Sequence, residues 1–124
     1  MAWTYRVTTG ELFHDDELTG IGYSGHGDGF DNPILQDVPN EGPIPQGNWT
    51  IGKPYTHIRL GPLTMNLTPN KGTNTLGRGA FRMHGDNSEV NHTASDGCIV
   101  LNKLIRQEVV KAVLIGDNQL TVVK

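Results

Sequence analysis

The chain has one cysteine, Cys98, which follows Ser95-Asp96-Gly97, and His84 lies upstream at the end of a strand-like run. A free thiol has a pKa of about 8.5, and a neighbouring imidazole is the usual way to obtain a thiolate at neutral pH. Gly97 would let a substrate approach the sulfur, and the backbone N–H groups of Asp96, Gly97 and Cys98 could line an oxyanion hole. On spacing alone, catalysis and a buried structural cysteine are about equally supported, because free cysteine is often buried.

Two short runs must position this pair. If Phe81-Arg82-Met83-His84 is a strand, Arg82 and His84 lie on one face and the two apolar residues on the other. Cys98-Ile99-Val100-Leu101 is apolar and also typical of a strand. We expect the two strands to be antiparallel neighbours joined by the loop 85–97. Paired Cα atoms would then be about 4.5–5.5 Å apart, which lets an imidazole reach a thiol.

The order of the residues along the chain excludes some classes of cysteine enzyme. All five histidines precede Cys98. Papain-like enzymes and related cell-wall amidases have the cysteine first, so they are excluded unless the base is not a histidine. His92 could instead join His84 and Cys98 in a zinc site, but no fourth ligand is apparent and the motifs of catalytic zinc are absent. We therefore expect no metal and no other cofactor.

The same stretch resembles the catalytic domain of the L,D-transpeptidases. Their signature is a His-Gly pair followed by Ser/Thr-x-Gly-Cys and an aliphatic residue, here His84-Gly85 and Ser95-Asp96-Gly97-Cys98-Ile99. The chain is also similar to small L,D-transpeptidase-like toxins that type VI secretion systems deliver. The segments that carry this likeness span most of the chain: Tyr23-Ser24-Gly25, Gly42-Pro43-Ile44-Pro45-Gln46-Gly47, Gly72-Thr73-Asn74-Thr75 and His92-Thr93-Ala94-Ser95.

The resemblance implies a role for each residue of the motif. Cys98 would be the nucleophile, His84 the general base, and the carbonyl of Gly85 the group that orients the imidazole. The family attacks the peptide stem of peptidoglycan at the L-centre of meso-diaminopimelate and releases D-alanine from a thioester. Water then completes a carboxypeptidase reaction, and an amine completes exchange or cross-linking. This chain has Asp96 where the family usually has histidine, and a shorter gap from His84 to Ser95, so the acceptor side of the site is expected to differ.

Several residues are candidates for substrate binding. Arg82 shares the face of His84 and could hold a substrate carboxylate, although a solvated strand arginine is an equally good interpretation. Tyr23 and Ser24 could line the cleft, but a tyrosine at a strand end is often only half-buried. The remaining candidates come from the motif and its surroundings: Ser95, Asp96, Gly97 and His92. His14 and His57 are expected at the surface.

The whole chain, 1–124, predicts one mainly β domain, an L,D-transpeptidase-like β-sandwich or barrel with one C-terminal helix. Its 124 residues are too few for two ordinary domains, and 16 Gly and 7 Pro favour short strands and tight turns. Residues 31–47 and 68–79 are expected to be loops. Besides the two runs above, we expect strands at Trp3–Val7, Glu11–His14, Leu18–Tyr23, Asn48–Ile51, Leu63–Leu67 (in a hairpin with Arg59-Leu60 around Gly61-Pro62) and Leu120–Val123.

A helix is expected to begin at Lys103, with Asn102 as its N-cap. Gly116 would end it. Residues at helical spacing place most of its apolar groups on one side, namely Leu104, Ile105, Glu108, Val109, Ala112 and Val113.

Other function classes are disfavoured by composition and context. Gly20–Gly25 matches G-x-G-x-x-G but continues into a glycine-rich run around His26 and Asp28 that cannot form the helix a dinucleotide site needs, and these two residues alone are weak as metal ligands. The net charge is −3, with no basic stripe for nucleic acid. No apolar run approaches the length of a membrane span.

We therefore expect an enzyme that acts on peptidoglycan stem peptides and serves as an antibacterial effector. No signal peptide is recognisable, so the chain is expected to be made in the cytoplasm and delivered by secretion-system components to the periplasm of a target cell. A cognate immunity protein is the expected partner. The alternative is a non-catalytic β module that binds cell wall, with Cys98 packed in its core.

Overall fold

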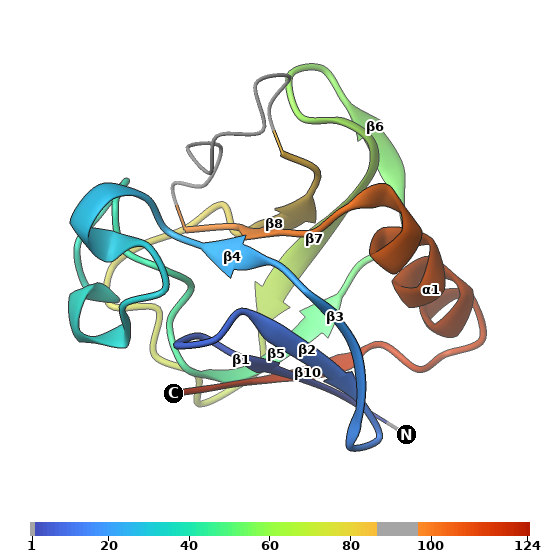
Figure 1. Cartoon of the computed structure of the whole chain (residues 1–124), viewed down its shortest axis with the longest axis horizontal. Helices are drawn as coiled ribbons and strands as arrows, with labels where there is room; N and C mark the ends of the chain where they lie inside the picture. The colour runs from blue at the N-terminus through green and yellow to red at the C-terminus, as the bar shows by residue number, and fades with distance from the viewer. Residues whose placement is uncertain (1, 87–96) are drawn as a thin grey trace.

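The computed structural model describes residues 2–86 and 97–124, which form a mainly β domain with one α-helix (Figure 1). The expected fold class is confirmed. The strands are β1 Trp3–Arg6, β2 Glu11–His14, β3 Glu17–Ile21, β4 Tyr23–Ser24, β5 Gly47–Ile51, β6 Tyr55–His57, β7 Gly61–Pro69, β8 Arg82–His84, β9 Ile99–Val100 and β10 Gln119–Val123. The helix is α1 Lys103–Leu114, and two 3₁₀ turns are η1 Gly27–Gly29 and η2 Pro33–Leu35.

The strands form one sheet that is nearly closed into a barrel. Its order is β3-β2-β1-β10-β5-β7-β8-β9-β4, with β6 paired to β7 off this path. The two ends of this order, β3 and β4, are consecutive in the chain and only Gly22 separates them. A Cβ at Gly22 would collide with the carbonyl oxygen of Val100. Glycine is therefore required where the chain crosses from one edge of the sheet to the other.

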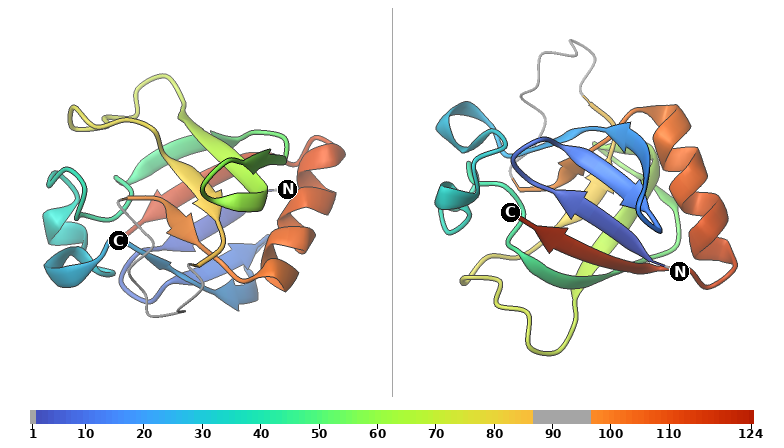
Figure 2. Two further views of the ribbon diagram at one scale, coloured as in Figure 1. Left: turned by 90° about the horizontal axis from the view of Figure 1, so that it is seen from above. Right: turned by 60° about the horizontal axis from the view of Figure 1, so that its bottom comes forward.

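The N-terminal meander predicted from the sequence is present. β1, β2 and β3 pair antiparallel in order, and the chain's last strand, β10, lies parallel to β1, so both termini belong to one part of the sheet (Figures 1 and 2). Asp15 and Asp16 form the turn between β2 and β3 with φ values of 50° and 72°. Two adjacent residues at positive φ are typical of a tight hairpin turn, in which aspartate is favoured. The expected strand at Leu18–Tyr23 is divided at Gly22 into β3 and β4.

The predicted helix is present at the expected position, and Asn102 caps it by accepting a hydrogen bond from the N–H of Ile105 at 2.9 Å. Its buried side chains are Ile105, Arg106, Val109, Ala112 and Val113. Leu104, which we expected on the buried side, is 74% exposed, and the long side chain buried in its place is Arg106. No helix among the described residues has the length and apolar character needed to cross a bilayer.

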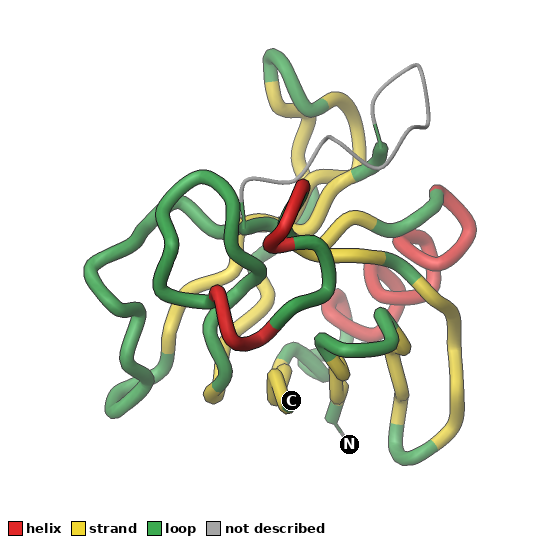
Figure 3. The backbone as a smooth tube through the Cα atoms, turned by 60° about the vertical axis from the view of Figure 1, so that its left-hand side comes forward, coloured by secondary structure: helices red, strands yellow, loops and turns green. Residues whose placement is uncertain are grey.

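A single apolar core fills the barrel and the space under α1. Both tryptophans belong to it and are almost fully buried, and each indole N–H donates to a backbone carbonyl, Trp3 to Asp117 at 3.3 Å and Trp49 to Pro45 at 3.2 Å. The buried indoles thus keep their polar groups satisfied. The long connection between β4 and β5, which contains η1 and η2, lies to one side of the sheet (Figure 3).

The predicted hairpin around Gly61-Pro62 is wrong. Both residues belong to β7, and the strand paired with them is β6, with His57 opposite Gly61. Residues 58–60 make the turn. Pro62 is tolerated because it is the second residue of β7, where the pairing with β6 is irregular, and the registers with β8 and β5 begin only at Met65 and Leu67. β7 also continues through Thr68 and Pro69 into the segment expected to be loop.

The predicted antiparallel pairing of the two central strands is also wrong. β8 and β9 are parallel neighbours, with Met83 opposite Ile99 and His84 opposite Val100. The other side of β8 pairs antiparallel with β7, and the other side of β9 pairs antiparallel with β4. A parallel pair needs a connection of about a dozen residues or more, and the segment 85–98 has that length.

Replacing the helix cap tests how much α1 contributes to the fold. We expect Asn102→Ala to lower the free energy of unfolding by about 1 kcal/mol, because the N–H of Ile105 loses its acceptor. Asn102→Asp keeps an acceptor oxygen and should stay close to wild type. Urea unfolding of the three proteins measures the difference. Equal stabilities for Asn102→Ala and wild type would contradict the capping role.

Candidate active site

Cys98, His84 and Arg82 line one cavity of about 530 Å³. β8 and β9 are parallel, and their register pairs Met83 with Ile99. Arg82 and Cys98, each one residue earlier in the chain, therefore lie beside each other. His84 lies two residues further along β8, about 6.6 Å away and on the same face as Arg82. The other residues around the cavity are Asn40, His57, Arg59, Leu60, Gly79 and Ala80.

The imidazole of His84 is held in one orientation. Its side chain is almost fully buried, with the residue 1% exposed, and its Nδ1 lies 2.6 Å from the carbonyl oxygen of Gly85. A carbonyl oxygen can only accept, so Nδ1 carries the proton and Nε2 of the neutral ring is left as an acceptor. This is the contact that the family resemblance led us to expect, and it fixes the tautomer that a general base needs.

Burial lowers the pKa of His84 below its usual 6.5, and the nearby charges of Arg106 and His57 act in the same direction. The hydrogen bond to Gly85 and the carboxylate of Asp86 oppose this effect. The pKa is lowered on balance, so the ring is neutral at neutral pH. A neutral imidazole can accept a proton from a thiol or return one to a leaving amine.

Arg106 packs against the backbone that holds His84. Its guanidinium donates from Nε to the carbonyl of Leu101 at 3.0 Å and from Nη1 to the carbonyls of Pro62 and Leu63 at 2.8 and 3.2 Å. A Cβ at Gly85 would lie 2.6 Å from Nη2 of the same arginine. Any side chain after His84 would therefore displace the guanidinium of Arg106 from these contacts, which gives a structural reason for the His-Gly pair.

Cys98 is 9% exposed, and its Sγ lies 3.9 Å from the carbonyl oxygen of Ala80. The preceding Gly97 has a φ of 129°, which side chains rarely allow. Ser24 fixes this turn, since its Oγ donates to the carbonyl of Gly97 at 3.3 Å and accepts from the N–H of Ile44 at 2.8 Å. Ser24 is fully buried, so it holds the backbone beside the thiol and does not line the cavity.

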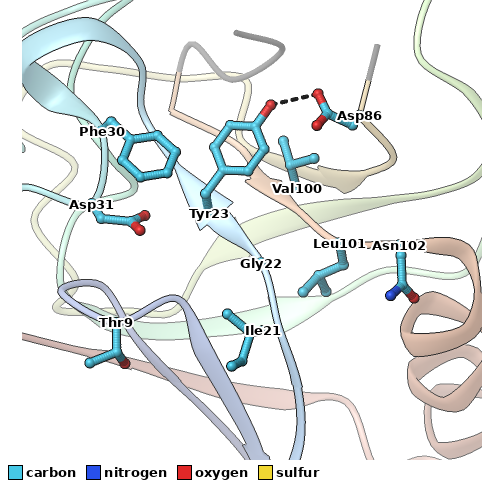
Figure 4. Close-up of a pocket in the computed structure, with 10 residues that line it drawn as sticks. All are labelled: Thr9, Ile21, Gly22, Tyr23, Phe30, Asp31, Asp86, Val100, Leu101 and Asn102. Carbon is cyan, nitrogen blue, oxygen red and sulfur yellow. Dashed lines mark hydrogen bonds between the residues drawn. The ribbon is translucent and has the colours of Figure 1, made fainter. Parts of the chain in front are cut away.

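Tyr23 lies in a different cavity from the one that Cys98 lines. This second cavity has a volume of about 350 Å³, and Figure 4 shows Tyr23 there with its ring against Phe30, 5.2 Å between centroids. The hydroxyl of Tyr23 donates to Oδ1 of Asp86 at 2.7 Å. β4 thus binds both sides of the site, through Tyr23 to the carboxylate of Asp86 and through Ser24 to the backbone carbonyl of Gly97.

Three predicted site residues, His92, Ser95 and Asp96, lie outside the described residues. The expected oxyanion-hole role of Asp96 and the alternative zinc site that includes His92 therefore also concern residues outside those that the structure describes.

Two cavity residues were not anticipated as functional. His57, expected at the surface, accepts hydrogen bonds at Nδ1 from the N–H groups of Arg59 and Leu60, at 3.0 and 3.1 Å, and lines the cavity. Arg59 lines it too and is exposed. His57 ends a short strand and Arg59 lies in the turn that follows, and their spacing matches no functional motif. The sequence therefore did not indicate that they line the cavity. Among the described residues around the cavity, two are arginines and none is a carboxylate, so the cavity favours an anionic ligand.

His14, also expected at the surface, has a structural position. Its Nε2 donates to Oδ2 of Asp117 at 2.6 Å, and its ring stacks on Trp3 with 4.0 Å between centroids. Asp15 lies nearby, 3.9 Å from Nε2. This group has the residue types of a metal site, but the close His14–Asp117 contact already ties β2 to the turn after α1.

Comparison with known proteins gives one match. Residues 19–124 match the family model of the Tlde1 domain. No curated protein and no solved structure matches the chain significantly.

The lowered pKa of His84 predicts how stability depends on pH. Above about pH 6.5 the ring is neutral in both folded and unfolded chains, and below it the unfolded chain binds a proton that the folded chain resists. The melting temperature of wild type should therefore fall from about pH 7 to about pH 5.5, and by less in His84→Asn. Cys98→Ala keeps the imidazole and should follow wild type. An equal fall in His84→Asn and wild type would contradict the burial of a neutral His84.

Proposed function

The chain belongs to the Tlde1 domain family of type VI secretion effectors, and from this membership and the site we propose that it is a cysteine L,D-carboxypeptidase/L,D-transpeptidase acting on peptidoglycan. In this proposal it removes or exchanges the terminal D-alanine of tetrapeptide stems. The observation that carries the proposal is that His84, oriented by the carbonyl of Gly85, lines the same cavity as the chain's single thiol.

The chemistry follows from the two side chains. Nε2 of neutral His84 takes the proton of the Cys98 thiol, and the sulfur attacks the carbonyl carbon at the L-centre of the diaminopimelate residue. The tetrahedral intermediate collapses when the C–N bond to D-alanine breaks, and His84 gives its proton to the leaving amine. The product is a thioester on Cys98.

The second half of the reaction releases the enzyme. His84 takes a proton from water, and the resulting hydroxide attacks the thioester to give the tripeptide stem and the free thiol. An amine in place of water gives exchange of the terminal residue or a cross-link. The choice between water and an amine depends on access to the thioester.

The charge of the cavity supports a substrate with several carboxylates. Arg82 is half-buried, Arg59 is exposed, and both line the cavity with His84 and His57. A tetrapeptide stem carries a C-terminal carboxylate and further carboxylates on its acidic residues. Guanidinium groups bind carboxylates through paired, charge-assisted hydrogen bonds. We assign Arg82 and Arg59 to the recognition of these groups.

The setting we propose is antibacterial. Peptidoglycan stems are exposed in the periplasm of Gram-negative cells, so the protein would act there after delivery by a type VI secretion system. A producing cell would need an immunity protein, and a partner that occupies the cavity of Cys98 and His84 would block the reaction directly.

One observation favours a competing function. Cys98 is only 9% exposed, as expected for a thiol packed in the core of a non-catalytic module that binds cell wall. The two functions differ in the chemistry of the stem peptide, because a binding module leaves it unchanged.

Release of D-alanine from tetrapeptide muropeptides is the direct test. Wild type should convert tetrapeptide to tripeptide, Cys98→Ala should form no product above background, and His84→Asn should be slower by about 10²–10⁴-fold because the proton acceptor is lost. Chromatography with mass detection measures the products. Melting temperatures within a few degrees of wild type would show that both variants are folded. No product from wild type, or an unchanged yield from Cys98→Ala, would contradict the proposal and favour the binding module.

Expression in two compartments of a Gram-negative host tests the target. We expect growth arrest or lysis when a periplasmic export signal is added to wild type, because the stems lie in that compartment, and no effect from the same chain in the cytoplasm. Exported Cys98→Ala, matched to wild type in abundance by immunoblotting, should be harmless. Equal toxicity from both compartments, or from exported Cys98→Ala, would rule out a periplasmic thiol-dependent activity.

A further inference from the structure

Arg78 lies in the connection between β7 and β8, and its guanidinium is fixed by backbone carbonyl groups. Nη1 donates to the carbonyls of Gln36 and Pro43 at 2.5 and 2.7 Å, and Nη2 donates to that of Gly42 at 2.9 Å. All three acceptors belong to the connection between β4 and β5. Such a planar fork, held at several points, keeps its position with little freedom.

The same guanidinium lies against the residue that precedes the thiol. A Cβ at Gly97 would collide with Nη2 of Arg78, so the two are in contact. The guanidinium also lies over the ring of Phe81, with Cζ 5.1 Å from the ring centroid. Phe81 is itself packed edge-on against the buried Trp49, 5.1 Å between centroids. The cation therefore contacts both the aromatic core and the residue that precedes the thiol.

The guanidinium keeps its charge in this position. Its pKa is lowered by burial and raised by the charges of Cys98 and Asp37, but arginine stays protonated at any pH near neutral. The three carbonyl acceptors bind its Nη1 and Nη2 groups without neutralising the charge. Asp37, whose side chain is exposed, offsets part of the charge.

We infer that Arg78 is a positioning residue whose fixed positive charge stabilises the thiolate of Cys98. A cation beside a thiol favours the ionised sulfur, and the attraction acts equally on both partners. Its Nη1 and Nη2 groups are bound to the backbone and Arg78 is not among the residues that line the cavity, so it acts through Cys98 and does not bind substrate. The inference rests on the proposed function in treating Cys98 as a nucleophile.

Other charged and titratable groups also face the cavity of Cys98. These are His84, His57, Arg59 and Arg82. Arg82 is the best-matched control, because it lines the same cavity, while its guanidinium donates to the hydroxyl of Tyr55 at 3.1 Å and to the carbonyl of Ala80 at 3.5 Å. A general effect of positive charge would make both arginines matter, whereas the contact with Gly97 singles out Arg78.

Alkylation of Cys98 by iodoacetamide as a function of pH tests this inference. Arg78→Gln should react about tenfold more slowly than wild type near neutral pH, with the midpoint of its pH dependence raised by about one unit, because less thiolate is present. Arg78→Lys keeps the charge and should restore much of the rate. Arg82→Gln should raise the midpoint by less than Arg78→Gln does, because Arg82 has no contact with Gly97 like that of Arg78. Equal midpoints for Arg78→Gln and wild type, or the same shift in Arg82→Gln, would overturn the inference.

If Arg78→Gln does not fold because the three carbonyl contacts are lost, Asp37→Asn tests the effect of the Arg78 charge on Cys98 instead. This change removes an exposed carboxylate beside Arg78 and leaves the guanidinium in place. A lower midpoint of alkylation would support the inference, because the charge of Arg78 is then less offset. An unchanged or higher midpoint would overturn it.

The two proposals fail in distinguishable ways, since alkylation uses no peptidoglycan. If wild type releases no D-alanine but the alkylation of Cys98 depends on Arg78, the proposed substrate is wrong and the charge effect stands. If wild type releases D-alanine and alkylation is insensitive to Arg78, only the inference about Arg78 is wrong.

Discussion

The pairing of the two-residue strand β9 with β8 on one side and β4 on the other is the constraint on which the site depends. The pairing with β8 sets the register that brings Cys98 and His84 to one cavity. The pairing with β4 brings Tyr23 to Asp86 and Ser24 to Gly97. Asp86 and Gly97, which flank the segment 87–96, are therefore both bound to β4. Gly22 makes this possible, because it is the only residue between β4 and the opposite edge of the sheet.

Two arginines act on the two candidate catalytic groups: Arg106, which is buried, and Arg78, which is half-buried. Arg106 lies beside Gly85 and helps to keep the imidazole of His84 neutral, whereas Arg78 lies beside Gly97 and favours negative charge on the sulfur. Both bond to backbone carbonyls, which satisfies buried donors at little cost in side-chain freedom. The glycines on either side of the segment thus have a common physical reason, since each leaves room for a guanidinium group.

Local patterns in the sequence predicted local structure well. The cap at Asn102, the strand at Glu11–His14 and the alternation in 81–84 depend on residues close in the chain, and all three are present. The direction of β9 relative to β8 was predicted incorrectly, because two strands close in sequence favour a hairpin. The parallel direction depends on the pairing of β8 with β7 and of β9 with β4, which join distant parts of the chain. Arg78 and His57 were missed for the same reason. The hydrogen bonds of Arg78 and the cavity that His57 lines join segments far apart in the chain, and neither residue belongs to a motif.

The arginines around the candidate site differ in whether their N–H groups are bound to the backbone or can reach a substrate. Arg78 and Arg106 are bound to backbone carbonyls and contribute charge but little free hydrogen bonding. Arg59 is exposed and Arg82 half-buried at the cavity, where donors can reach a ligand. In the proposed mechanism, changes to the first pair should alter the ionisation of Cys98 and His84, and changes to the second pair the affinity for anionic stems. Such a site could bind a polyanionic peptide and still hold a reactive thiolate, because different arginines provide the charge for each task.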